Sequence, residues 1–168
     1  MSREDSVPSD IDVIGFQPQA TGVEKVMAVS CKAWQDGFDP SAKLRGLRES
    51  LPKNNPRKTW HQFRELWKPK WSTAFHDAVT NLTGEREFTY CIAVTWLKGP
   101  LSADEAAALW SSDPTIRENL NGCTFRFLTL EEMWNKVIEE ATFHPAPSEA
   151  GRLAQLLKAA HLHDGSRL

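Results

Sequence analysis

The 168-residue sequence predicts a mixed α/β fold, in which a small mixed central sheet is flanked by helices. Three observations predict this class. Two short apolar segments near the N-terminus have the pattern of a strand hairpin. Residues 88–97 (FTYCIAVTWL) are apolar at both alternating sets of positions, which is typical of a central strand. Amphipathic helical segments alternate with these strands, as they do in α/β domains.

The N-terminal third predicts two strands and a helix. Residues 11–16 (IDVIGF) form a short strand, and a turn with a proline and a glycine leads to a second strand over residues 25–34 (KVMAVSCKAW). A further turn precedes a short helix over residues 41–50, whose leucines lie on one side.

The middle of the sequence predicts helices before and after the central strand. A capping box at residues 59–62 (TWHQ) begins a helix that Pro69 ends or kinks. A helical stripe continues over residues 71–84 and stops at a glycine. The central strand follows at residues 88–97, and a second capping box opens a short helix over residues 102–110.

The last third predicts a strand over residues 124–128 and a capped amphipathic helix over residues 129–141. A proline-rich linker and a final amphipathic helix complete the chain. We therefore expect an α/β domain over residues 1–143. Residues 144–168 are expected to form a linker and a helix that packs on the core or on a partner.

The composition and the N-terminal sequence argue against a membrane-spanning or secreted protein. The composition is that of an ordinary globular protein, and no apolar run approaches the ~20 residues that a membrane span needs. The N-terminal segment MSREDSVPSD lacks the apolar core of a secretory signal. The three cysteines are far apart and lie in apolar runs, so they predict buried thiols in a reducing cytoplasm. We expect a cytoplasmic protein that does not bind membranes.

Charge is unevenly distributed along the chain. The formal net charge is −2, but residues 43–70 hold nine basic and two acidic residues, so this segment carries +7 and the rest carries −9. Such segregation favours a polyanionic partner, although a solvated loop and helix face would give the same pattern. The candidate nucleic-acid-binding residues are Lys43, Arg45, Arg48, Lys53, Arg57, Lys58, Arg64, Lys68 and Lys70. Three tryptophans of the same region, Trp60, Trp67 and Trp71, would stack on bases if exposed, but their spacing favours the core for at least two of them.

Two charged residues lie inside apolar strands. Asp12 is flanked by isoleucine and valine in the first strand, and Lys32 follows Cys31 near the end of the second. Either charge is costly to bury without a partner. If the strands are neighbours, the two residues form an ion pair, or they combine a metal-binding carboxylate with a lysine that positions water.

These residues resemble a known family. Asp12 in DIDVIGF and Ser30-Cys31-Lys32 at the end of the next strand are similar to the PD-(D/E)xK, or restriction-endonuclease-like, nuclease superfamily. Members carry an Asp on one strand and a Glu-x-Lys on the next. The later strands and helices are also similar, so the resemblance covers roughly residues 9–141. It implies a restriction-endonuclease-like core and makes residues 1–143 a nuclease-like α/β domain.

The resemblance implies a role for each residue. Asp12 would hold Mg²⁺ with help from the backbone carbonyl of Cys31, and Lys32 would orient or activate water and stabilise charge on the phosphate. Ser30 would be a weak or water-mediated ligand. The implied activity is Mg²⁺-dependent phosphodiester hydrolysis by a metal-dependent endonuclease.

The chain departs from the family pattern in two places. Ser30 stands where the family has its second acid, and a neutral hydroxyl is a weaker Mg²⁺ ligand than a carboxylate. Family members also usually begin with a helix before the first strand, where this chain has only a few polar residues, so we expect a truncated, minimal or degenerate copy. The candidates for a replacement carboxylate are Asp10, Asp36 and Asp39.

The sequence therefore predicts a nuclease-like DNA-binding protein, with hydrolysis left open. One alternative is a catalytically inactive relative that binds nucleic acid or a protein. Another is a structural or assembly subunit whose basic face meets an acidic protein. Whether the chain forms a homodimer or binds a partner protein is also left open.

Overall fold

The fold is built around one small mixed sheet, seen in a computed structural model that describes residues 11–32, 36–49, 59–143, 149, 151–153 and 155–156. Its four strands lie in the order β1-β2-β3-β4. They are β1 (Val13–Phe16), β2 (Val26–Lys32), β3 (Thr89–Val94) and β4 (Thr124–Thr129). The predicted α/β class with a small mixed sheet is confirmed.

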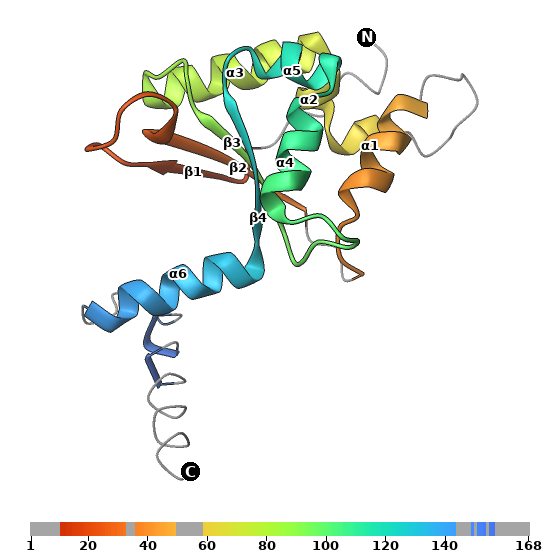
Figure 1. Cartoon of the computed structure of the whole chain (residues 1–168). Coiled ribbons are helices and arrows are strands. Elements are labelled where there is room, and N and C mark those ends of the chain that lie inside the picture. The colour runs from red at the N-terminus through yellow and green to blue at the C-terminus, as the bar shows by residue number, and fades with distance from the viewer. Residues whose placement is uncertain are drawn as a thin grey trace. The chain divides into compact units, whose positions relative to one another are not determined.

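The chain divides into two compact units, residues 1–128 and 129–168. The first unit contains nearly all of the sheet and most of the helices (Figure 1). Its helical elements are the 3₁₀ turns η2 (Gly22–Glu24) and η3 (Thr59–Gln62) and the helices α1 (Pro40–Glu49), α2 (Arg64–Trp67), α3 (Pro69–Thr83), α4 (Ala103–Ser111) and α5 (Pro114–Leu120). The second unit contains α6 (Leu130–Phe143), which begins at the predicted capping box of Thr129 and Glu132.

Strand pairing fixes which residues can meet. β1 is antiparallel to β2, with Val13 opposite Val29, so the predicted hairpin is confirmed. β2 is parallel to β3, from Met27 opposite Thr89 to Lys32 opposite Val94. A parallel pair needs a crossover, and here the crossover is the whole segment that contains α1, α2 and α3.

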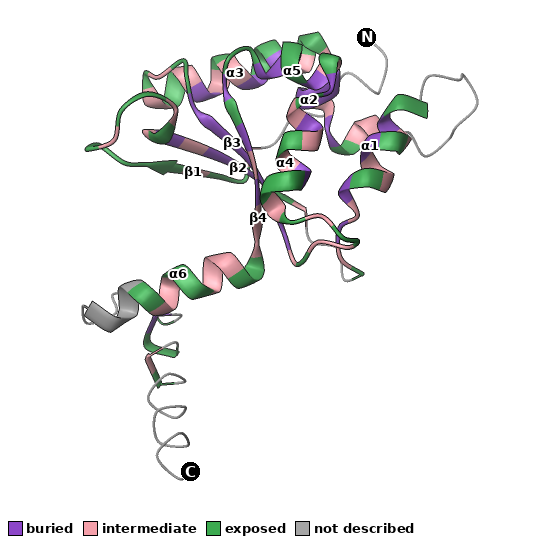
Figure 2. Cartoon of the chain, in the orientation of Figure 1, coloured by how far each residue is buried: buried purple, intermediate pink, exposed green. Residues whose placement is uncertain are grey.

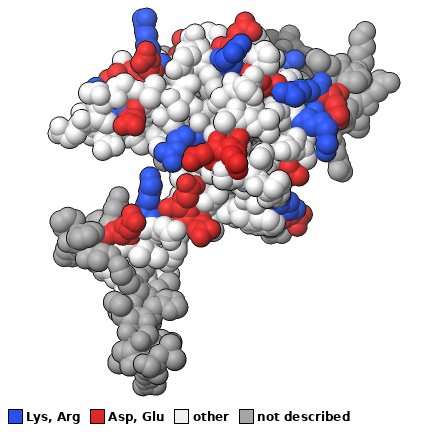
Figure 3. Space-filling model, viewed as in Figure 1, with Lys and Arg blue, Asp and Glu red and all other residues white. Residues whose placement is uncertain are grey.

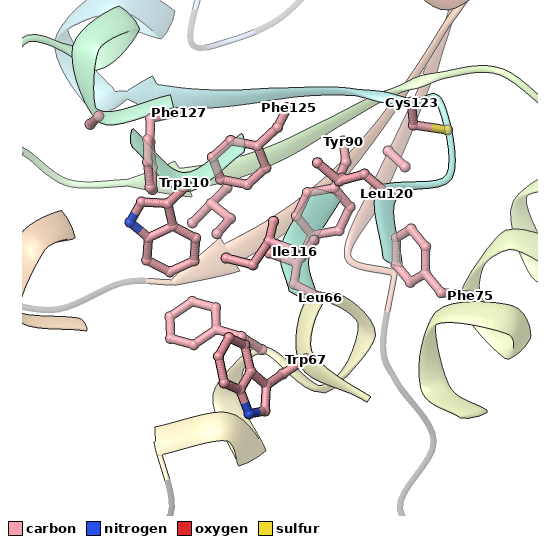
Figure 4. Close-up of a cluster of buried hydrophobic side chains, with 14 of the residues drawn as sticks. Leu66, Trp67, Phe75, Tyr90, Trp110, Ile116, Leu120, Cys123, Phe125 and Phe127 are labelled. Carbon is pink, nitrogen blue, oxygen red and sulfur yellow. The ribbon is translucent and has the colours of Figure 1, made fainter. Parts of the chain in front are cut away.

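The main apolar cluster lies on one face of the sheet. All six residues of β3 are buried, as predicted for a central strand. Alternate residues of the strands point into one apolar cluster with the helices, and Figure 2 shows buried residues along the helix sides that face the sheet. At its centre the indole of Trp110 packs against Phe38, Phe63, Phe125 and Phe127. Figure 4 shows Trp110 beside Phe125 and Phe127.

Two helical regions differ from the sequence-based expectation. The predicted helix from Thr59 is broken into η3 and the single turn of α2, because Phe63 leaves helical geometry to bury its ring completely. α5 was not predicted, although its start has a recognisable signal. The Asp113 carboxylate accepts hydrogen bonds from the first-turn amides of Thr115 and Ile116, and Pro114 occupies the first turn.

Trp110 provides a test of this core. It is fully buried, and its Nε1 donates a hydrogen bond to the carbonyl of Pro40 at 3.0 Å. Trp110→Ala should lower the free energy of unfolding by about 3–5 kcal/mol, measured by urea denaturation, because it leaves a large cavity. Trp96, which is 48% exposed, is the control, and Trp96→Ala should cost clearly less. Equal losses in the two variants would contradict the assignment of the core.

Candidate functional site

The predicted site residues lie where β1 begins and β2 ends. Side chains alternate along β2, so Ser30 and Lys32 project from the core face and Cys31 from the opposite face. Their burial agrees with this alternation: Ser30 is 1% exposed, Lys32 is half-buried and Cys31 is exposed. The expectation that all three cysteines are buried is therefore wrong for Cys31, whereas Cys91 and Cys123 are buried.

Asp12 is held against the end of β2 by its own backbone and side chain. Its amide donates to the carbonyl of Val29 at 3.2 Å, and its Oδ2 accepts a hydrogen bond from the amide of Cys31 at 2.6 Å. The hairpin therefore brings the Asp12 carboxylate directly to the backbone of the Ser30-Cys31-Lys32 segment.

The charges of Asp12 and Lys32 both act on the thiol of Cys31, and the structure shows no direct ion pair between these two described residues. The pKa of the Cys31 thiol is raised, first by partial desolvation and then by the Asp12 carboxylate, whereas the Lys32 ammonium acts to lower it. The structure shows direct ion pairs elsewhere, between Lys25 and Glu85 and between Arg48 and Asp113.

Ser30 belongs to a buried polar group that the sequence did not reveal. The hydroxyl of Tyr90 donates a hydrogen bond to Oε1 of Glu65, and both residues are buried. Burial raises the pKa of Tyr90, the Glu65 carboxylate raises it further, and the Ser30 hydroxyl acts to lower it. Oγ of Ser30 nevertheless has no hydrogen-bond partner of good geometry. Ser30 thus lies beside Tyr90, beneath the surface.

The side chains of Asp12 and Ser30 fit a Mg²⁺ site poorly. Among the described residues, no three His, Cys, Asp or Glu side chains gather as a metal would require. A groove of about 470 Å³ beside Asp12 is lined by β1 and the end of α3, and among the described residues of this lining Asp12 is the charged one. Ser30 is buried, and a hydroxyl is a weak ligand for this hard cation.

Of the three candidate replacement carboxylates, the structure describes Asp36 and Asp39. Asp39 is engaged at the start of α1, where its Oδ1 accepts a hydrogen bond from the amide of Ala42 at 2.9 Å. Asp36 is exposed, and nothing in the structure assigns it to the site. Asp10 lies outside the described residues.

The basic segment is only partly described. Lys53, Arg57 and Lys58 lie outside the described residues. Arg45, Arg48 and Lys70 are exposed, while Lys43, Arg64 and Lys68 are half-buried. Figure 3 shows lysine and arginine side chains gathered over α1, at the right of the view. The Nε of Arg48 donates to the buried Asp113 at 2.9 Å, so this arginine also links α1 to the start of α5.

The three tryptophans within or directly after this segment differ in exposure. Trp67 is buried, and Trp60 packs against the core while remaining half-buried. Trp71 is also half-buried. Cationic side chains lie over the rings of both half-buried tryptophans.

Alkylation of Cys31 tests the geometry of this site. Cys31 is the exposed cysteine, so iodoacetamide should modify it first. Asp12→Asn should lower the pKa of the thiol and speed its modification near pH 8, whereas Lys32→Ala should raise the pKa and slow it. The measurement is the modification rate against pH. Identical profiles for the wild type and both variants would contradict the placement of Asp12 and Lys32 around Cys31.

Comparisons with known proteins do not assign this chain to a family. No family model matches it, and neither the curated proteins nor the solved structures contain a significant match. In the described residues, no helix combines the length and apolarity needed to cross a membrane. The functional argument therefore depends on the residues of this chain alone.

Proposed function

We propose that this chain is a nuclease-like α/β domain that binds nucleic acid, with DNA as its expected ligand. The observation that carries the proposal is the arrangement of β1, β2 and β3. An antiparallel pair followed by a helical crossover to a parallel strand is consistent with the PD-(D/E)xK resemblance. The same arrangement brings Asp12 against the segment that contains Lys32.

The crossover itself supports binding to a polyanion. It carries the basic segment, and Arg45, Arg48 and Lys70 expose their side chains on α1 and α3. Lysine and arginine contacts with phosphates supply affinity that depends little on base sequence, because phosphates are common to every site. Lys32 could bind a phosphate through its charge alone, so phosphate binding does not depend on a complete metal site.

Metal-dependent hydrolysis is a second candidate function, favoured by one observation. The Asp12 carboxylate is held in place by the amide of Cys31, next to a lysine on the same strand end. Magnesium would supply a Lewis acid for phosphodiester hydrolysis. The described donors fit that ion poorly, so we favour binding without hydrolysis.

Salt dependence tests the binding proposal. DNA affinity should fall about 10²-fold between 50 and 200 mM salt if about four phosphates are contacted, because binding releases counterions. Replacing Lys43 and Arg45 on α1 by alanine should weaken binding and reduce this salt slope. Replacing the exposed Arg86 and Arg117 by alanine removes the same charge elsewhere and should have little effect. Fluorescence anisotropy with a labelled duplex measures the affinity and its dependence on salt. Affinity that is independent of salt would contradict the proposal and favour a protein partner.

A plasmid assay separates binding from hydrolysis. The wild type should bind supercoiled plasmid but leave it intact in Mg²⁺ or Mn²⁺, because the described site supplies one suitably placed carboxylate. Asp104→Ala, which removes an exposed acid on α4, is the control for Asp12→Ala. Nicking that Asp12→Ala abolishes and Asp104→Ala preserves would contradict binding without hydrolysis and establish the second candidate.

A further inference from the structure

Two half-buried indoles lie on the segment that leads from η3 through α2 into α3. Trp60 is in η3 and Trp71 is in the first turn of α3, while Trp67 between them is 8% exposed and belongs to the core. Trp67 is therefore a core residue, whereas Trp60, which also packs against the core, and Trp71 are each partly exposed to solvent. An accessible aromatic face is the feature that a flat ligand needs for stacking.

Cationic side chains connect these two rings. The ammonium of Lys68 lies 5.0 Å from the ring centre of Trp60, and the guanidinium of Arg64 lies 5.3 Å from that of Trp71. Lys70 is also near Trp71, at 5.9 Å. The backbone holds this set together, since the amide of Lys68 donates to the carbonyl of Arg64 at 2.8 Å and the amide of Trp71 donates to the carbonyl of Lys68 at 2.9 Å.

The acidic residue of this stretch is turned away from the surface. Between Thr59 and Trp71 the sequence has one carboxylate, Glu65, against three lysines and arginines. Glu65 is 6% exposed and accepts the hydrogen bond of the buried Tyr90 hydroxyl. The exposed charge of this segment is therefore cationic, and it surrounds accessible aromatic rings.

Another cation–aromatic contact in the molecule has a different environment. Lys25 lies 5.6 Å from the ring centre of Phe16, which is 50% exposed, but its Nζ also pairs with Glu85 at 2.6 Å. That contact combines an aromatic ring with a neutralised lysine, so it offers no attraction for phosphate. Phe16 thus provides a matched control for the tryptophans.

We propose that Trp60 and Trp71, with Arg64, Lys68 and Lys70, form a binding surface for single-stranded DNA. The proposal rests on the proposed nucleic-acid function and specifies the form of its ligand. Bases of a single strand expose their faces and can stack on the indoles, whereas bases inside a duplex have both faces covered by their neighbours. The lysines and arginine then contact the phosphates on either side of the stacked bases.

The exchange of contacts is favourable. A cation over an exposed ring contributes about two- to fivefold in an equilibrium constant, and stacking of one base contributes about 5- to 150-fold. A base that replaces the cation over Trp71 therefore gains more than it displaces. The displaced cation remains close enough to reach a phosphate of the same strand.

The test compares three labelled oligonucleotides of about 20 residues by fluorescence anisotropy: a single strand, a duplex, and an abasic strand with the same phosphates. The wild type should bind the single strand most tightly. Trp71→Leu should weaken that binding about tenfold and leave binding of the other two unchanged. Trp60→Leu should act in the same direction. Trp71→Phe should restore part of the loss, because it keeps an aromatic ring, and Phe16→Leu should change nothing. Circular dichroism verifies the fold of each variant.

The outcomes separate this proposal from the proposed function. Equal affinity of the wild type for all three ligands would overturn the stacking surface, while nucleic-acid binding would stand. An equal loss for all three ligands in folded Trp71→Leu would also overturn it, as would a matching loss in Phe16→Leu. If no ligand binds the wild type, the proposed function itself fails.

Discussion

The parallel pairing of β2 with β3 is the constraint on which the rest of the structure depends. β3 is buried along its whole length, so its register with β2, from Met27–Thr89 to Lys32–Val94, is fixed by burial on both faces. Parallel strands cannot be joined by a tight turn. The long crossover that joins them contains the basic segment, and the antiparallel β1 pairs with the other side of β2.

The acidic and basic residues of that crossover differ in burial. Glu65 on α2 is drawn beneath the surface by the hydroxyl of Tyr90 on β3, which links the crossover to the central strand. The neighbouring Arg64 and Lys68 stay at the surface, over tryptophan rings. Glu65, which bonds to Tyr90, therefore lies directly beside Arg64 in the sequence, although one side chain points into the core and the other contributes to the surface. A carboxylate buried beside a phenol is costly to leave without its partner, so this link also holds α2 in place.

The sequence predicts the sheet better than the site. The central strand and the capping boxes at Ser102 and Thr129 are local patterns, and the structure confirms them. The break before α2 depends on how Phe63 fills the core, which no local pattern contains. Exposure of Cys31 follows from the alternation of faces at a strand end, not from its apolar neighbours. Ser30 was treated as a weak ligand, and only the packing of Tyr90 and Glu65 reveals its buried surroundings.

Hydrogen–deuterium exchange with saturating single-stranded DNA tests the central claim most directly, because it locates the ligand without any substitution. The surface is predicted to include η3, α2 and the start of α3, so amides of residues 59–71 should exchange more slowly in the complex. Amides of β1, which pairs with β2 at the edge of the sheet and contains the control residue Phe16, should not change. Protection of β1 with none in residues 59–71 would contradict the account, since the strand would then bind away from the cationic tryptophan surface.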